Sequence, residues 1–513
     1  MPQKAVNNTT LIVCLILSIA SAVCHVPVLH MRLNVYDEGI VLAGADRVLQ
    51  GDVPYRDFWS MYPPGQFYTL AFLFKLFGTS VLVERIYDLA IRSLLALCGF
   101  LVTRKLGLST GAAVAGWAMA LVWTASTWFA AYPVYVALAL IWMSLLLYLH
   151  YLENKQARWL FCSGLVMALG AAFRHDLGGM AALVLLVALV LEKAIGTEGR
   201  WRSLGAYLGG ALSAGLPVVI YLIAAVGVGP LVDQLIVTPA DVMPRYRWLP
   251  YPAFSFDALA FYLFPLTLGL GLGLSLVLIV RKKERDRFTY GLFVLSLTGL
   301  LFLNQVRVRS DEIHLFPAAM AGMLVLPGLV SFVLSSSSKA AKALALVLVL
   351  TASALFVGRA GDWIESLSGD DFVLSRRSAM GRAGFARMDP ELKDVVSFIE
   401  DHTAENEAIY VGVKNHDQFT INDVIVPFVA GRPYATRYHE LHPGVTTTLG
   451  VQQEIVQELE TAPVGLIVLR EDYWPEPNQT RVDGHVDLLD RYIAEHYALV
   501  EEFGPYELYR SSP

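Results

Sequence analysis

Long apolar runs recur along this chain of 513 residues and limit what it can fold into. Eleven of them come near the roughly 17–25 residues that a helix needs to cross a bilayer. Their approximate limits are 10–29, 82–103, 108–128, 132–150, 159–173, 177–192, 203–228, 258–280, 288–303, 316–334 and 341–358. With 55% hydrophobic and 16% charged residues, the composition excludes an ordinary soluble protein. The sequence predicts a mainly α-helical polytopic membrane protein with about eleven transmembrane helices.

Clusters of positive charge occur in alternate loops of this predicted bundle. These loops contain Arg104-Lys105, Lys155 and Arg158, Lys193 with Arg200 and Arg202, Arg281-Lys282-Lys283 with Arg285 and Arg287, and Lys339 with Lys342. All of them fall on the same side as Lys4. Because cytoplasmic loops are enriched in Lys and Arg, we expect a cytoplasmic N-terminus. The first polar loop and the chain after Gly358 are then expected on the outer face.

The charge of the chain divides it into two predicted domains. Residues 359–513 carry 27 acidic and 13 basic side chains, whereas the preceding part has an excess of positive charge. This split predicts a transmembrane domain over 1–358 and a soluble extracytoplasmic domain over 359–513. An acidic soluble domain also argues against nucleic acid as a partner, since binding phosphates requires a basic surface.

The soluble part has the pattern of an α/β domain. Helices are expected over 391–402, 451–459 and 486–496, buried strands over 409–413 and 465–469, and a closing strand over 503–509. The polar loop Lys414-Asn415-His416-Asp417 follows the first strand, where α/β folds often bind ligands. Polar residues also gather in such loops without any function, and both interpretations are open at this point.

The stretch from Tyr36 to Gly65 is rich in groups that a membrane would reject. It begins with the adjacent carboxylates Asp37 and Glu38, which could act as an acid–base pair or cap a helix beginning near Gly39. The apolar segment from Pro64 to Gly78 is too short to cross and is predicted to be re-entrant or interfacial.

Five arginines are expected on the outer face, where positive charge is normally sparse. They are Arg174, Arg245, Arg247, Arg307 and Arg309. A guanidinium matches phosphate oxygens, so a lipid phosphate is their predicted ligand. Further candidate substrate contacts are Tyr55, Arg56, Asp57, Tyr62, Arg85, His175, Asp176, Asp311 and His314. Asp88 and Arg92 lie four residues apart within a span, and a buried ion pair is the favoured interpretation.

Short motifs in these segments resemble those of the GT-C class of polytopic membrane glycosyltransferases. The resemblance is to its protein O-mannosyltransferase-like and aminoarabinose-transferase-like branch. It is carried by Tyr36-Asp37-Glu38-Gly39, Gly44-Ala45, Gly51 to Tyr55, Tyr62-Pro63-Pro64-Gly65, and Arg309-x-Asp311-x-x-His314.

This resemblance implies a hexosyl- or pentosyltransferase that takes its sugar from a polyprenyl phosphate on the outer face, with inversion at the anomeric carbon. It maps Asp37 onto the catalytic acid residue as general base, with Glu38 beside it as a second candidate. It also implies a bacterial inner membrane, a glycan, lipid or protein acceptor, and contact with membrane lipids.

The sequence does not decide whether a metal ion is required, and it allows one alternative function. Asp37, Glu38 and His314 could ligate a divalent cation, but no spacing establishes a site, so no obligatory cofactor is expected. A transporter or flippase for a lipid-linked or anionic substrate is the alternative to a glycosyltransferase. Such proteins often have internal repeats and broken helices near the midplane. The sequence has no obvious repeat, and its polar clusters lie at outer helix ends, which favours the enzyme.

Overall fold

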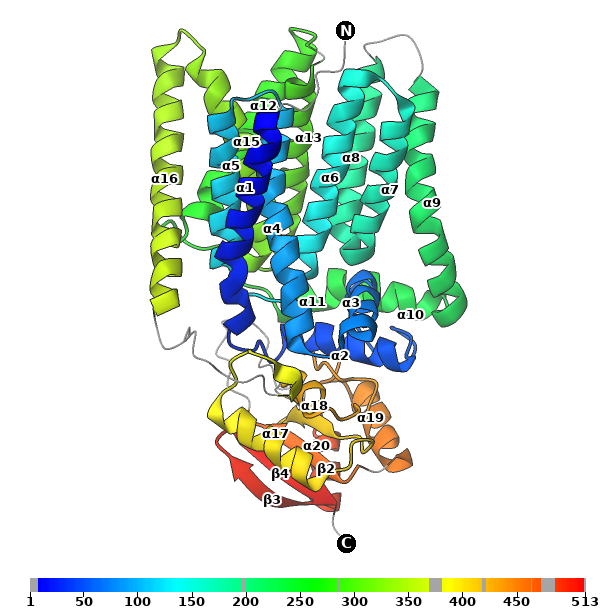
Figure 1. Ribbon diagram of the computed structural model, residues 1–513. Coiled ribbons are helices and arrows are strands. Elements are labelled where there is room, and N and C mark those ends of the chain that lie inside the picture. The colour runs from blue at the N-terminus through cyan, green and yellow to red at the C-terminus, as the bar shows by residue number, and fades with distance from the viewer. Residues whose placement is uncertain are drawn as a thin grey trace.

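The chain folds into a helical bundle with a smaller α/β domain at one end (Figure 1). The computed structural model describes residues 8–194, 200–284, 286–368, 381–417, 421–462, 464–471 and 485–511. The described N-terminal helix begins at the end of the bundle far from the α/β domain, as Figure 1 shows. The α/β domain therefore lies at one end of the bundle, and the N-terminal helix begins at the other end.

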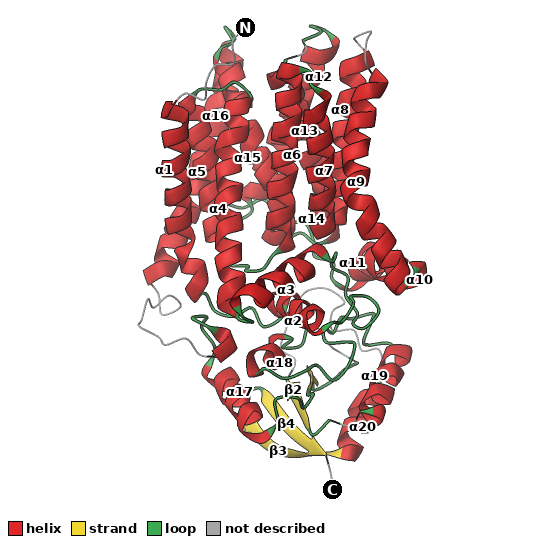
Figure 2. Cartoon of the chain, turned by 45° about the vertical axis from the view of Figure 1, so that its right-hand side comes forward, coloured by secondary structure: helices red, strands yellow, loops and turns green. Residues whose placement is uncertain are grey.

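Nine helices among the described residues are long and apolar enough to cross a membrane. Eight of them are α1 (Asn8–His25), α4 (Val81–Lys105), α6 (Pro133–Asn154), α8 (His175–Ala194), α9 (Arg200–Val226), α12 (Leu259–Val280), α15 (Glu312–Leu334) and α16 (Lys339–Ser368), and the ninth is α13 (Arg287–Phe302) continued by α14 (Asn304–Val308). The other two predicted spans are helices of 17 residues each, α5 (Thr110–Ser126) and α7 (Ala157–Phe173). Both run alongside the longer helices (Figures 1 and 2). The prediction of a mainly helical polytopic membrane protein is confirmed.

The outermost helices of the bundle present apolar side chains to the surroundings. On α1, Leu11 and Leu15 are 64% and 62% exposed, and on α16 Val357 is 73% exposed. In water such a continuous apolar surface would be unfavourable, whereas lipid tails solvate it. The bundle is therefore the membrane-embedded part of the protein.

Short helices fill the space between the bundle and the α/β domain (Figures 1 and 2). They are α2 (Asp37–Gln50), α3 (Gly65–Phe77), α10 (Val228–Val232), a π-helical stretch (Asp233–Val242), α11 (Met243–Tyr246) and α14 (Asn304–Val308); a 3₁₀ turn (Val26–His30) follows α1. With 13 residues, α3 is about 20 Å long and too short to cross a bilayer. This layer contains most of the predicted site residues.

The C-terminal domain is a mixed four-stranded sheet with helices, as predicted. Its elements are a 3₁₀ turn (Gly381–Ala383), α17 (Pro390–His402), β1 (Tyr410–Val413), α18 (Ile425–Ala430), α19 (Leu449–Thr461), β2 (Leu466–Arg470), α20 (Leu488–His496), β3 (Tyr497–Phe503) and β4 (Tyr506–Ser511). The strand order is β1-β2-β4-β3, with β1 and β2 parallel and the other pairs antiparallel. The closing strand expected over 503–509 is found as β4, and a hairpin that turns at Gly504 adds the unexpected strand β3 at the edge of the sheet.

The first polar loop and the C-terminal domain share one hydrophobic core. Val41 and Leu42 of α2 pack in the same cluster as Val395 and Ile399 of α17. Main-chain hydrogen bonds join the two parts as well, from Leu33 N to Arg387 O (2.9 Å) and from Ile425 N to Val35 O (3.1 Å). At the predicted domain boundary, α16 continues past residue 358 to Ser368. The α/β domain is consequently fixed to the first loop by packing and not only by its linker.

We expect Gly39→Val to loosen this interface. A Cβ at Gly39 would lie 2.7 Å from the main-chain nitrogen of Ile425, so α2 and α18 would have to move apart. Overpacking of this kind costs about 1–3 kcal/mol, and the measurement is thermal unfolding of the purified protein. Gly269→Ala is the control, since nothing lies within 4 Å of the added methyl group. Equal melting temperatures for the two variants would contradict the close packing of α2 on α18.

Candidate active site

Asp37 is the first residue of α2 and its carboxyl group makes only one weak contact. Asn34 holds the backbone, because its Oδ1 accepts a hydrogen bond from Asp37 N at 2.9 Å. The contact from Asn34 Nδ2 to Asp37 Oδ2 is long, at 3.4 Å. The N-cap position belongs to Tyr36, which makes no side-chain capping bond. The half-buried carboxyl group of Asp37 is therefore not used as a helix cap.

Several charges surround Asp37. Burial raises the pKa of its carboxyl group above the usual value, and the nearby charges of Arg247, His442 and His314 oppose that rise, as does the hydrogen bond from Asn34. These residues come from four separate parts of the chain. The fold thus brings Asp37, the segment after α11, the start of α15 and the C-terminal domain to one place.

Glu38, next in sequence, lies in a different environment. Its carboxylate is completely buried and forms a two-point ion pair with Arg85 of α4, with Nε–Oε1 at 2.9 Å and Nη2–Oε2 at 3.0 Å. Glu38 Oε2 also accepts a hydrogen bond from Asn34 N at 3.0 Å. Arg85 donates in addition to the carbonyls of Met31 and Arg32. The two residues fix the turn before α2 against α4.

The other predicted acidic residues are engaged by partners near to them in sequence. Asp57 pairs with Arg56 at 2.7 Å and Asp176 with Arg174 at 2.8 Å. Asp311 caps α15, accepting from His314 N at 2.9 Å, and pairs with Arg309 at 2.7 Å. Burial would raise the pKa of Asp311, but the bonds and charge of His314, with the charge of Arg309, lower it to about 2.

The five arginines predicted for the outer face fall into two groups. Arg245 and Arg307 are exposed, and Arg245 pairs with Asp241 one helical turn away. Arg174, Arg247 and Arg309 are half-buried, and the carbonyl of Arg247 accepts a hydrogen bond from Arg309 at 3.1 Å. Nη1 of Arg247 is buried without a hydrogen-bond partner among the described residues. Arg247 therefore has an unused hydrogen-bond donor close to Asp37.

Two tyrosines of the first polar loop, Tyr55 and Tyr62, contact each other near Asp37. The carbonyl of Tyr62 accepts a hydrogen bond from the hydroxyl of buried Tyr55 at 2.7 Å. Burial raises the pKa of Tyr62, the charge of Asp37 adds to this rise, and Arg174 opposes it. Tyr55 has a φ of +71°, an unfavourable conformation for a non-glycine residue, so the surrounding contacts hold the loop in this shape. His175 is exposed at the start of α8.

The C-terminal domain adds residues that the sequence reasoning did not select. The hydroxyl of Tyr36 lies 2.9 Å from Nδ1 of His442, and Nε2 of His442 lies 3.0 Å from Oε2 of Glu440. All three side chains are buried. The signal available in the sequence was His439-Glu440-Leu441-His442, three ionisable residues in four positions. Nothing in the sequence indicated that this segment contacts the first loop.

The loop of Lys414 to Asp417 has a different place in the domain. His416 is buried, with Nδ1 2.6 Å from Asp490 Oδ1 and Nε2 2.9 Å from the hydroxyl of Tyr410. Lys414 pairs with Glu507 of β4. These contacts join elements of the domain to one another, which matches the structural interpretation of this loop.

Among the described residues, no three His, Cys, Asp or Glu side chains gather in an arrangement that could hold a metal ion. Asp37, Glu38 and His314, the candidate ligands, do not form such a group. The oxygens of Glu38 are instead directed at Arg85.

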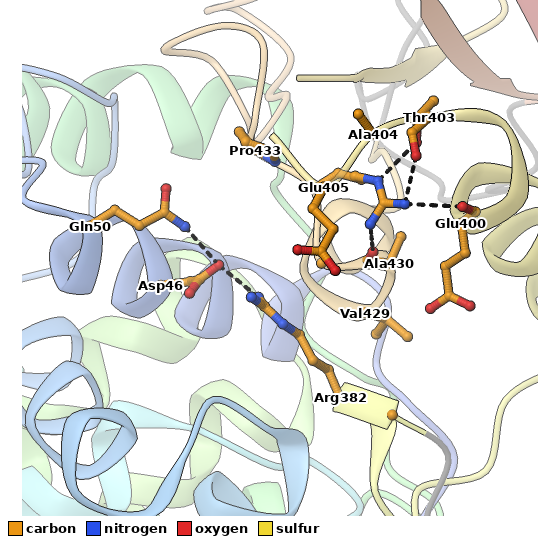
Figure 3. A pocket seen from close by; sticks show the side chains of 13 residues that line it. Asp46, Gln50, Arg382, Glu400, Thr403, Ala404, Glu405, Val429, Ala430 and Pro433 are labelled. Atoms are coloured by element: carbon orange, nitrogen blue, oxygen red, sulfur yellow. Dashed lines mark hydrogen bonds and ion pairs between the residues drawn. The ribbon is translucent and has the colours of Figure 1, made fainter. Parts of the chain in front are cut away.

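A cavity of about 870 Å³ lies between α2 and the C-terminal domain (Figure 3). Asp46 and Gln50 form one wall, where Asp46 pairs with Arg382 at 2.9 Å. In the opposite wall Arg432 donates to the carbonyls of Glu400 and Thr403 and so satisfies the end of α17. Asp46 follows Asp37 by nine residues, which is about 13 Å along a helix. This cavity is separate from the site around Asp37.

Comparisons with known proteins agree with this architecture. Residues 61–224 match the family of dolichyl-phosphate-mannose-protein mannosyltransferases. The crystal structure of ArnT from Cupriavidus metallidurans bound to undecaprenyl phosphate has the same fold, with a TM-score of 0.56 and 14% identity over 99% of this chain and 100% of that one. The apo form of that protein gives a TM-score of 0.55 and 15% identity over the same shares.

A weaker likeness is to the arabinofuranosyltransferase AftD from Mycobacteria, in its R1389S mutant. Its TM-score is 0.45 at 14% identity, over 97% of this chain and 41% of that one. No curated protein matches the sequence. The resemblance to GT-C glycosyltransferases is confirmed by the family match and by the fold.

We expect Arg85→Met to destabilise the protein by about 3–5 kcal/mol, because it leaves the buried carboxylate of Glu38 without its partner. Thermal unfolding measures the change, and Arg85→Met with Glu38→Gln should recover part of the loss. Arg245→Met removes a solvent-exposed ion pair and should cost less than about 1 kcal/mol. Strictly additive losses in the double variant would show that the two side chains do not depend on each other.

Proposed function

We propose that this chain, a GT-C membrane glycosyltransferase of the kind that uses polyprenyl-phosphate sugars, transfers the sugar with inversion to an acceptor hydroxyl, with Asp37 as general base. The family match over residues 61–224 and the fold shared with ArnT support the class of enzyme. The role of Asp37 is inferred from the site itself.

The observation that carries this assignment is the free carboxyl group of Asp37. Within the described residues, every other candidate acid in the layer is committed to an arginine. Glu38 is held by Arg85, Asp57 by Arg56, Asp176 by Arg174, and Asp311 by Arg309. A base must have an unoccupied oxygen within reach of the hydroxyl that it deprotonates, and Asp37 meets this condition.

The proposed reaction is a single displacement. The acceptor hydroxyl oxygen forms a bond to the anomeric carbon while the bond between that carbon and the phosphate oxygen breaks. The hydroxyl proton passes to Asp37, and the electron pair of the broken bond leaves with the polyprenyl phosphate. Partial burial favours this step, since it raises the pKa of Asp37 towards that of an effective base.

The leaving phosphate gains negative charge, and we assign its stabilisation first to Arg247. This guanidinium lies beside Asp37 and has a buried Nη1 without a partner among the described residues. Fixed donors in a site of low dielectric stabilise developing charge more than water does. Arg174 and Arg309 form ion pairs with Asp176 and Asp311. We propose that they assist Arg247 in stabilising the leaving phosphate. The exposed Arg245 and Arg307 are placed to attract the lipid phosphate from the membrane surface.

The rest of the first loop is assigned to the substrates. Four residues that precede α3 in the chain are proposed to contact the acceptor: Tyr55, Arg56, Asp57 and Tyr62. Glu38 and Arg85 position the start of α2, and we propose that His175, Asp176, Asp311 and His314 also contact the substrate.

The membrane setting is also part of the proposal. The basic loops lie at the end of the bundle opposite the C-terminal domain, so that domain and the site are assigned to the outer face. ArnT from Cupriavidus metallidurans was crystallised with undecaprenyl phosphate, which supports a polyprenyl-phosphate donor and a bacterial inner membrane for this chain.

We expect Asp37→Asn to keep donor binding and to lower turnover by about 10²–10⁴-fold, because the amide cannot accept the proton. The test follows release of lipid phosphate from a panel of polyprenyl-phosphate sugars by the protein in nanodiscs. Asp52→Asn is the matched control, since Asp52 lies in the same loop and pairs with Arg47. Equal turnover by wild type and Asp37→Asn would exclude Asp37 as the base. No binding of any donor would favour the transporter over the enzyme.

We expect Arg247→Met to weaken binding of a polyprenyl phosphate by about 10–100-fold, the loss typical of hydrogen bonds to a charged group. Titration with undecaprenyl phosphate in nanodiscs gives the dissociation constant. Arg245→Met, two residues earlier and exposed, should change it by a smaller factor. A larger loss of affinity in Arg245→Met than in Arg247→Met would indicate that the phosphate binds near the exposed Arg245, at the membrane surface.

A further inference from the structure

Three buried polar side chains form a row of close contacts that links the C-terminal domain to the residue before Asp37. They are Glu440, His442 and Tyr36. Tyr36 Oη lies 3.1 Å from the carbonyl of Leu441, 2.9 Å from Nδ1 of His442 and 3.1 Å from Nε2. Nε2 of His442 in turn lies 3.0 Å from Oε2 of Glu440. Trp59 of the first loop packs against the imidazole, with ring centroids 5.3 Å apart. The segment from Glu440 to His442 is thus enclosed by the first loop.

A count of hydrogen-bond donors assigns the protons in this row. A carbonyl oxygen can only accept, and we assign the single proton of the Tyr36 hydroxyl to Leu441. We assign Glu440 as a carboxylate, which only accepts, so Nε2 of His442 donates to its Oε2. The oxygen of Tyr36 is then left as the acceptor for Nδ1. With this assignment both ring nitrogens of His442 carry protons, which is the imidazolium form, and Nε2 directs its single proton to Glu440 and not to Tyr36.

We propose that His442, held as an imidazolium by Glu440, is a positioning residue of the transfer reaction, which fixes Tyr36 and adds a fixed positive charge beside Asp37. This inference rests on the proposed role of Asp37 as the base. It makes the C-terminal domain part of the catalytic site and not only a cover over it.

The electrostatic surroundings support this role. Asp37 interacts with Arg247 after α11, His314 at the start of α15, Asn34 before α2 and His442 of the C-terminal domain, and its charge acts on Tyr36 and Tyr62 as well. The charge of His442 lowers the pKa of Asp37, and so it favours the form that can take a proton. Glu440 lies 3.0 Å from Nε2 of the imidazole, and the uncharged Trp59 packs against the ring at an interplanar angle of 55°.

Both ring nitrogens of the neighbouring His439 are buried without partners among the described residues. Burial lowers the pKa of His439 well below its usual value, and the charges of Arg47 and His442 lower it further. A neutral His439 therefore adds no competing charge. The single positive charge in this segment is the one assigned to His442.

The same chemistry occurs a second time in the domain and provides a matched control. Tyr410, His416 and Asp490 form a similar buried row, with distances of 2.9 Å and 2.6 Å. These three residues join β1, the following loop and α20 within the domain core. A change at His416 disturbs the fold in a comparable way, but it leaves Asp37 with all its neighbours.

The test is the pH dependence of kcat/KM for sugar transfer by the full chain in nanodiscs. For a base, activity is lost as the pH falls through its pKa, so removing a neighbouring positive charge moves this acidic limb to higher pH. We expect a shift of about one pH unit for His442→Gln and for Glu440→Gln, the lower end of the effect of a close opposite charge. His416→Gln should leave the limb in place. Variants with wild-type melting temperatures and an unshifted limb would overturn the inference.

A second measurement does not depend on activity. In protein labelled with ¹⁵N-histidine, the signals lost in His442→Gln identify its ring nitrogens. Both should show bound protons at pH 7 in the wild type, and at least one should lose its proton in Glu440→Gln. A neutral His442 in the wild type overturns the inference even if Asp37 proves to be the base. An imidazolium in a protein that transfers no sugar would overturn the proposed function alone.

Discussion

The buried ion pair between Glu38 and Arg85 fixes the start of α2 against α4, and the environment of Asp37 depends on it. Neighbouring residues on an α-helix point about 100° apart. When Glu38 faces Arg85, Asp37 is turned towards Arg247 and the C-terminal domain. A buried ion pair adds little net stability, because both charges lose their hydration. What it does give is a single orientation of α2, and so two adjacent carboxylates have two different surroundings.

The second constraint is the shared core of the first loop and the C-terminal domain. Apolar residues of α2, α3, α17 and α18 belong to one cluster. Gly39 allows α2 to approach the backbone of Ile425, which no larger side chain would permit. The domain therefore has a fixed place over the membrane bundle. This fixed placement is what allows Glu440 and His442 to reach Tyr36, about 400 positions earlier in the sequence.

The charged side chains of this layer are of two kinds, those paired with a neighbour and those left with unused hydrogen-bonding capacity. Most acidic side chains have an arginine beside them, and these local pairs set the shape of the loops. Asp37 and Arg247 retain unused hydrogen-bonding capacity within the described residues. In a partly desolvated site, such free groups interact strongly with a ligand. The arrangement suits a reaction in which a proton is removed on one side and a phosphate departs on the other.

The sequence by itself determined the membrane bundle, the α/β domain and the location of the polar layer, because apolar length and charge are local properties of a chain. It left β3 unpredicted, since an exposed edge strand such as Tyr497–Phe503 lacks the alternation of a half-buried one. It ranked Asp37 over Glu38 only through a family resemblance, because two adjacent carboxylates offer no physical distinction in a sequence. It gave no reason to place Glu440 and His442 near them. These distinctions depend on which group faces which across the fold, and only the tertiary structure decides that.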